Sequence, residues 1–161
     1  SSINKIVAFK NICFAFTTGL LVIFLSIYYF YPLLSTPLFL IFLFVFLRMF
    51  VNTVFLDIKD VESDTKGVLL TLPLVFGREK TLKVLQAITI LSVMPIFLAF
   101  YLRIIPTFSL MLVFVVPYTF YYFNKSRLGE NFYLVNYVLA DFEFILWPIF
   151  ILLGKALINT I

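Results

Sequence analysis

Long apolar stretches, separated by short polar or proline-containing breaks, make up nearly the whole chain. A helix that crosses the hydrocarbon core of a bilayer needs about 20 predominantly apolar residues. The stretches that meet this length cover residues 12–31, 37–56, 82–102, 106–123 and 132–153. We expect kinks at Pro95 and Pro117, and Pro148 falls inside the last stretch; such interior prolines are tolerated because neighbouring helices can satisfy the backbone groups that a proline frees. The pattern predicts an all-α integral membrane helical bundle of about five transmembrane helices, forming a single transmembrane domain over residues 1–161.

The composition supports the bilayer as the solvent of this chain. Of the 161 residues, 63% are hydrophobic and only 12% are charged, which is too little charge to cover the surface of a soluble domain. The chain has no histidine and a single cysteine, Cys13, which excludes the usual ligand set of a zinc site. The basic residues gather in particular loops, so a nucleic-acid surface is not expected and a lipid bilayer is the expected environment.

The distribution of lysine and arginine predicts the orientation in the membrane. If the polar segment 57–80 is cytoplasmic, that side carries Lys5, Lys10, Lys59, Lys66, Arg78, Lys80, Lys83, Lys125 and Arg127. The opposite side then carries only Arg103 and Lys155. Because cytoplasmic loops are enriched in basic residues, we expect the polar segment to face the cytoplasm. In a prokaryote the membrane would be the plasma membrane.

Acidic residues are concentrated at the start of this polar segment. Asp57, Asp60 and Asp64 are spaced i, i+3, i+7, which places three carboxylates within about 60° of one helical face. A solvated acidic helix end is the simpler interpretation, but carboxylates that share a face repel one another unless a cation is bound. Mg²⁺ binds one or two protein carboxylates and keeps positions open for phosphate oxygens. Basic residues downstream, Lys66, Arg78 and Lys80, are candidates for holding further phosphate charge.

A longer pattern surrounds these aspartates. The stretch from Arg48 to Asp64, RMFVNTVFLDIKDVESD, is followed by Lys66-Gly67 and by TLPLVFG at 71–77. It resembles the second aspartate-rich motif of the UbiA-type intramembrane prenyltransferases. Members of that family use Mg²⁺ to transfer a polyprenyl group from its diphosphate to an acceptor, which is unknown here. The resemblance implies that Asp60 and Asp64 are the catalytic, metal-binding pair and that Asp57 is an additional metal ligand.

The resemblance extends to other positions and also shows a departure. Lys5 resembles the basic residue that contacts diphosphate, and Lys10 falls in the same region. The family has nine helices and two aspartate-rich motifs, whereas this chain corresponds to helices five to nine and lacks the first motif. It therefore resembles a C-terminal half, whose expected partner is the missing N-terminal four-helix half, and it is expected to be inactive alone. The alternative is a membrane transport or scaffold protein that binds a divalent cation without catalysis.

Charged residues within the apolar stretches are the last candidates. Ionisable groups inside a span usually face the bundle interior and find partners. Arg48 and Asn52, at i and i+4, share a helical face and are predicted to line a substrate cavity between the helices. Asp141 lies at a depth similar to that of Arg48, so an Arg48–Asp141 ion pair is expected. Glu143 lies about 200° around the helix from Asp141, and the sequence assigns it no partner.

Overall fold

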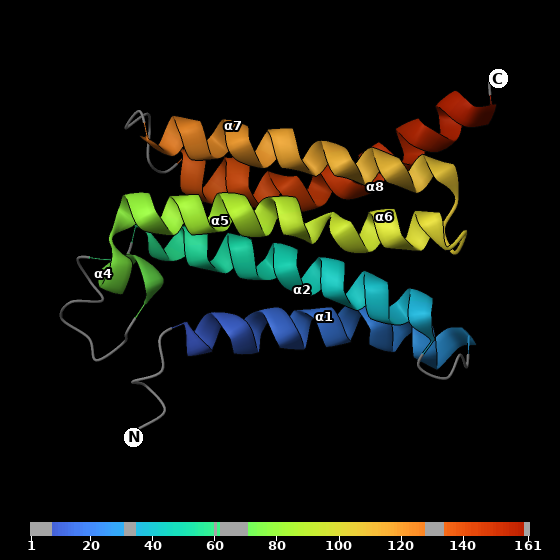
Figure 1. The fold of residues 1–161 in the computed structure, drawn as a ribbon, viewed down its shortest axis with the longest axis horizontal. Coiled ribbons are helices and arrows are strands. Elements are labelled where there is room, and N and C mark those ends of the chain that lie inside the picture. The colour runs from blue at the N-terminus through green and yellow to red at the C-terminus, as the bar shows by residue number, and fades with distance from the viewer. Residues whose placement is uncertain (1–7, 31–34, 60, 62–70, 128–133, 160–161) are drawn as a thin grey trace.

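Helices account for every regular element in the part of the chain that the computed structural model describes, residues 8–30, 35–59, 61, 71–127 and 134–159. In chain order they are α1 (Phe9–Phe30), α2 (Thr36–Asp57), α4 (Leu72–Phe76), α5 (Arg78–Ser92), α6 (Met94–Tyr101), the 3₁₀ helix η2 (Thr107–Phe114), α7 (Val115–Arg127), the π-helix η3 (Leu134–Leu139) and α8 (Ala140–Asn159). Figure 1 shows the long helices lying side by side along one axis. The predicted all-α class is confirmed.

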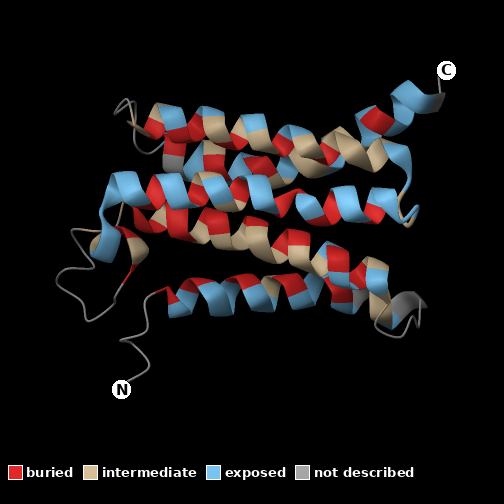
Figure 2. Ribbon diagram, in the orientation of Figure 1, coloured by how far each residue is buried: buried red, intermediate tan, exposed pale blue. Residues whose placement is uncertain are grey.

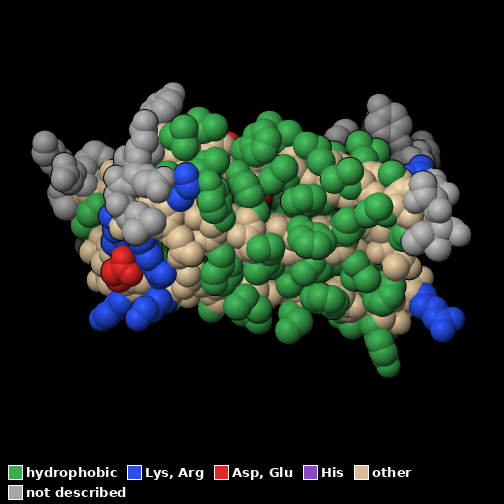
Figure 3. Space-filling model, turned by 90° about the horizontal axis from the view of Figure 1, so that it is seen from above, with side chains coloured by type: hydrophobic (Ala, Val, Ile, Leu, Met, Phe, Trp, Pro, Cys, Tyr) green, Lys and Arg blue, Asp and Glu red, His purple; other side chains and the backbone are tan. Residues whose placement is uncertain are grey.

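Five helical segments are long and apolar enough to cross a membrane, as predicted. They cover Phe9–Tyr28, Thr36–Asp57, Arg78–Tyr101, Thr107–Arg127 and Tyr137–Ile158. Large hydrophobic residues remain exposed on these helices, and Figure 2 shows exposed positions along one side of α1. Figure 3 shows such side chains covering the middle of one face, with basic side chains toward its two ends. This distribution is typical of a protein whose middle lies in hydrocarbon and whose ends meet water.

The spans alternate in direction along the chain: α1, α5–α6 and α8 run one way, and α2 and η2–α7 run the other, so each end of the bundle holds both helix starts and helix ends (Figure 1). One end holds the start of α1, the end of α2, the start of α5, the end of α7 and the start of α8. The polar motif therefore begins at the end where α1 starts, since α2 ends at Asp57. The end of α1, the start of α2, the end of α6 and the start of η2 lie at the opposite end.

The prolines interrupt the helices in different ways. At Pro95 the predicted kink is a break, because α5 ends at Ser92 and Pro95 lies in the first turn of α6. A proline is tolerated there since the first-turn N–H groups have no intrahelical acceptor. Pro117 lies in the first turn of α7, just after the 3₁₀ segment, and Pro148 lies inside α8.

Some boundaries differ from those predicted. The segment expected to be polar as far as Lys80 becomes helical at Arg78, because Gly77, with φ 79°, allows the chain to turn from α4 into α5. The charged residues 78–80 thus form a water-exposed first turn and not a loop. α7 also continues past Phe123 to Arg127, and α8 continues past Leu153 to Asn159.

A hydrophobic core near the motif end of the bundle supports the site. Phe55 of α2 packs against Tyr122 and Phe123 of α7, with ring centroids 5.1 and 5.0 Å apart. Leu82 and Leu85 of α5 belong to the same buried cluster. This core fixes α2 against α5 and α7, and α1 packs along the other side of α2.

Candidate functional site

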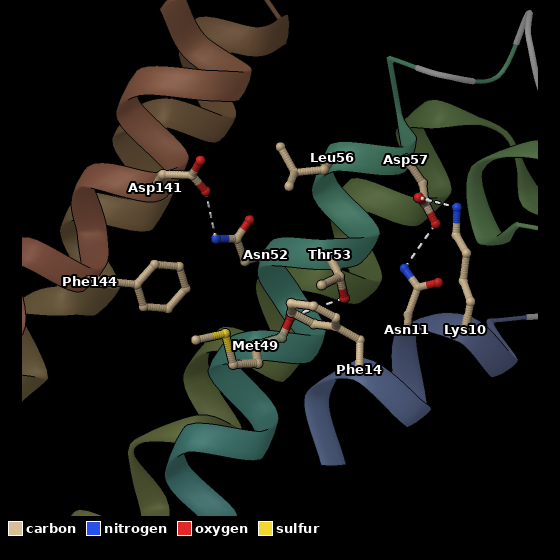
Figure 4. Close-up of a pocket in the computed structure, with 10 residues that line it drawn as sticks. All are labelled: Lys10, Asn11, Phe14, Met49, Asn52, Thr53, Leu56, Asp57, Asp141 and Phe144. Atoms are coloured by element: carbon tan, nitrogen blue, oxygen red, sulfur yellow. Dashed lines mark hydrogen bonds and ion pairs between the residues drawn. The ribbon is translucent and has the colours of Figure 1, made fainter. Parts of the chain in front are cut away.

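A pocket of about 460 Å³ lies beside α2, between the first turns of α1 and the start of α8 (Figure 4). Its lining residues are Lys10, Asn11 and Phe14 from α1, Met49, Asn52, Thr53, Leu56 and Asp57 from α2, and Asp141 and Phe144 from α8. Hydrogen bonds join polar side chains into two groups, one around Asp57 and one around Asn52, and Thr53 lies between them (Figure 4). Such a mostly apolar pocket with a few polar groups is typical of a small-molecule site.

The first polar group is built around the Asp57 carboxylate. Lys10 Nζ lies 2.8 Å from Asp57 Oδ1, and Asn11 Nδ2 donates to Asp57 Oδ2 over 2.8 Å. Asp57 and Asn11 are buried, whereas the Lys10 side chain is 45% exposed. An aspartate in the last turn of a helix is disfavoured by the negative end of the helix dipole. The α1 residues therefore stabilise a carboxylate that α2 alone would disfavour.

The second polar group joins α2 to α8. Asn52 Nδ2 donates to Asp141 Oδ1 over 3.3 Å. Asn52 is only 5% exposed, and its Oδ1 is buried with no hydrogen-bond partner among the described residues. Phe144, one turn further along α8, adds an apolar wall. Asp141 thus belongs to the pocket, although the sequence indicated it only as an ion-pair partner.

A buried polar cluster lies deeper in the bundle, behind this pocket. Arg48 Nε donates to Glu143 Oε1 over 2.8 Å, and Arg48 Nη2 is ion-paired with Glu143 Oε2. Arg48 Nη2 also donates to Thr119 Oγ1 over 2.6 Å, and the Tyr122 hydroxyl donates to Glu143 Oε2 over 3.1 Å. Arg48 and Glu143 are 0% and 1% exposed. This cluster ties α2, α7 and α8 together at mid-depth.

The predicted Arg48–Asp141 pair is wrong, because Arg48 is paired with Glu143. α2 and α8 run in opposite directions, so a step toward the bundle interior goes down in number on α2 and up on α8. Starting from the Asn52–Asp141 contact, Arg48 lies about 6 Å deeper and Glu143 about 3 Å deeper, and the long arginine side chain spans the difference. Arg48 is also not among the residues that line the pocket, whereas Asn52 is.

The comparison with known families decides the identity of the chain. The model of the UbiA prenyltransferase family matches residues 3–154. The chain belongs to the UbiA prenyltransferase family. Membership implies prenyltransferase activity, prenyl diphosphate substrates and a lipid environment. Comparisons with curated proteins and with solved structures gave no match.

The structure describes some of the predicted UbiA site residues and not others. Asp57 and Lys10 come together, as described above. Asp60, Asp64, Lys5 and Lys66 lie outside the described residues. Within the described ranges no group of three acidic, cysteine or histidine side chains is arranged to hold a metal ion.

Arg78 was predicted to bind diphosphate and has a different contact. Its Nη2 donates to Ser126 Oγ over 3.1 Å and to the Ser126 carbonyl oxygen. It therefore links the start of α5 to the last turn of α7, where a cation also complements the helix dipole. Arg78 does not line the pocket.

Two of the described aromatic residues contribute to the pocket. Phe14 and Phe144 line it. Phe55 and Tyr122 are fully buried in the core. The Lys59 Nζ lies over the Tyr137 ring, 3.4 Å from the centroid of that ring. Twenty-two phenylalanines and nine tyrosines share the helices, so residue type alone does not distinguish a pocket wall from a core or lipid-facing position.

Proposed function

We propose that this protein transfers a polyprenyl group from its diphosphate to an acceptor within the membrane, in a Mg²⁺-dependent reaction on the cytoplasmic side. In this proposal Asp57, Asp60 and Asp64 hold the metal, and Asp60 and Asp64 are the catalytic pair. The chain supplies the second of the two aspartate-rich motifs of the family.

The observation that carries the proposal is the polarity of the pocket beside α2. A prenyl diphosphate is an anionic head on an apolar tail. The pocket has a cation, Lys10, at the end where the aspartate motif begins, and apolar walls that include Phe14, Met49 and Phe144. Its charged end suits a diphosphate, and its walls suit an isoprenoid chain.

The donor chemistry at the end of α2 fits magnesium. Asp57 presents a carboxylate to the pocket, and two further carboxylates, Asp60 and Asp64, follow directly in the sequence. Carboxylate oxygens are the ligands that Mg²⁺ prefers, and Mg²⁺ bound there supplies positive charge that stabilises a departing diphosphate.

The residues of the chain have separate roles in this reaction. Asn11 holds the Asp57 carboxylate in place through its amide N–H. The half-exposed ammonium of Lys10 can exchange its contact with Asp57 for a phosphate oxygen, and Lys5 and Lys66 are proposed as further diphosphate contacts. The apolar walls exclude water, which protects the allylic carbocation that forms when the bond to diphosphate breaks.

The proposal includes a requirement for a second half. The 161-residue sequence contains one aspartate-rich motif, and neutralising a diphosphate requires charge from both motifs of the family fold. We therefore propose that this chain is inactive alone and becomes active with a four-helix half that carries the first motif.

The experiment is a transfer assay with radiolabelled prenyl diphosphate in membranes. Membranes containing both halves are expected to form labelled lipid product with Mg²⁺ and none with EDTA. Membranes containing only the 161-residue chain are expected to form none. Product formation in EDTA would contradict the metal dependence, and robust product from the chain alone would contradict the half-enzyme proposal.

A further inference from the structure

The Asn52–Asp141 pair has hydrogen-bonding capacity that the protein does not use. The amide orientation is fixed, because turning Asn52 Oδ1 toward the Asp141 carboxylate would bring two acceptors together. Nδ2 therefore faces Asp141, at 3.3 Å, and Oδ1 is left buried with no partner in the described ranges. Burying an acceptor without a partner is unfavourable. Both side chains line the pocket, where the exposed Asp141 carboxylate is directly accessible to a ligand and the buried Asn52 Oδ1 becomes accessible only when the amide shifts.

The neighbouring Thr53 side chain does not share the unused hydrogen-bonding capacity of Asn52. Thr53 also lines the pocket, but its hydroxyl donates to the carbonyl oxygens of Met49 and Phe50 at 3.0 and 3.2 Å. It is therefore satisfied within its own helix. Asp141 is exposed although it lies within the span Tyr137–Ile158, where an ionisable side chain is costly and usually functional.

The chemistry of the pair favours a hydrogen-bond donor over a metal ion. It presents one carboxylate and one amide oxygen, and no group of three acidic, cysteine or histidine ligands exists among the described residues. A hydroxyl group can donate to either oxygen and needs no charge compensation.

We propose that Asn52 and Asp141 form a subsite that binds a hydroxyl group of the prenyl acceptor. This inference rests on the proposed transferase function, because it assigns one side of the same pocket to the second substrate. Asn52 lies five residues before Asp57 on α2, about 7.5 Å along the helix axis. The subsite is therefore deeper than the diphosphate end, so that an acceptor bound there lies beside the first carbons of the prenyl chain. The acceptor class is a phenol or an alcohol.

The subsite can be tested by binding alone, without Mg²⁺ or prenyl diphosphate. The chain has a single tryptophan, Trp147, whose ring centroid is 5.1 Å from that of the pocket residue Phe144. Iodinated aromatic probes quench tryptophan fluorescence at close range. We would titrate 4-iodophenol and 4-iodobenzyl alcohol into the 161-residue chain in lipid nanodiscs, each against its methyl ether, which cannot donate a hydrogen bond.

The wild-type chain is expected to be quenched at lower concentration by a hydroxyl probe than by its methyl ether, by about tenfold for a hydrogen bond to a charged group. The phenol and benzyl alcohol arms distinguish the two acceptor classes. Asn52→Leu and Asp141→Leu should each abolish the preference for the hydroxyl probe. One of the two variants is enough for the test, provided that it inserts into the nanodisc and remains helical. Thr53→Val, the matched control, should keep it.

Equal quenching by the hydroxyl probes and their methyl ethers in the wild-type chain would overturn the subsite. A preference that persists in both leucine variants would also overturn it. So would loss of the preference on addition of Mg²⁺, because Mg²⁺ would then compete with the probe for the same oxygen atoms. None of these outcomes depends on catalysis, so failure of the subsite and failure of the transferase proposal are separable.

Discussion

Removing the Glu143 carboxylate should destabilise the bundle strongly, because four polar contacts converge on it. The carboxylate pairs with two nitrogens of Arg48 and accepts from the hydroxyls of Thr119 and Tyr122. Glu143→Leu leaves the Arg48 guanidinium buried without a counter-charge, a loss of about 3–5 kcal/mol. The unpaired Tyr122 hydroxyl adds about 1 kcal/mol or more, whereas Thr119 retains the Val115 carbonyl oxygen as an acceptor, 2.9 Å away.

The double variant Arg48→Met/Glu143→Leu should be milder than the sum of the two single variants. With both charges gone, no uncompensated ion remains, and apolar side chains fill the space. We expect a coupling free energy of about 2–3 kcal/mol from a double-mutant cycle. The assay is the free energy of unfolding in mixed micelles, from SDS titration followed by circular dichroism.

The matched control is the cycle between Arg48→Met and Asp141→Leu. Arg48 and Asp141 share no hydrogen-bond partner among the described residues, so their effects should add to within about 0.5 kcal/mol. Additive losses for Arg48 with Glu143, or strong coupling of Arg48 with Asp141, would refute the assignment of the buried pair.

Two further predictions concern helix contact and the charged end of the pocket. A Cβ added at Gly154 would lie 2.6 Å from the Phe108 carbonyl oxygen, a backbone atom that cannot yield easily. Gly154→Ala should therefore cost about 1–3 kcal/mol in the same unfolding assay, and an unchanged free energy would show that α8 and η2 are not in close contact. Lys10→Met should raise the KM for prenyl diphosphate about tenfold in the two-half enzyme, through loss of one charge-assisted contact, while Lys10→Arg retains most of the affinity. Equal KM values for Lys10→Met and wild type would exclude a diphosphate contact.

The spans were predictable because hydropathy and length report directly on helices that must satisfy their backbone in lipid. All five apolar stretches correspond to helical segments. The boundaries were less accurate, since charged residues such as those at 78–80 are compatible with a helical first turn in water as well as with a loop. The start of α5 follows from Gly77, whose positive φ the sequence suggested only indirectly.

The site was predictable at the level of chemistry but not of pairing. Asp57 and Lys10 were both candidates, and the structure adds that they contact each other through α1 and α2. The membrane depth estimated from position along each helix placed Arg48 near Asp141. That estimate carried no information on how α8 is rotated about its axis. That rotation is set by side-chain contacts across three helices, and it directs Glu143 to Arg48 and leaves Asp141 for Asn52. The roles of Asp60 and Asp64 stay predictions.

The transfer rate of aspartate variants in the two-half enzyme tests most directly whether the aspartate motif binds Mg²⁺ for prenyl transfer. Asp60→Asn and Asp64→Asn should each abolish Mg²⁺-dependent product formation while membrane insertion is unchanged. Glu62→Gln is the matched control and should retain activity, because Glu62 belongs to the same acidic stretch of the sequence but falls outside the i, i+3, i+7 spacing of the three aspartates. Near-wild-type transfer by either aspartate variant would contradict the account.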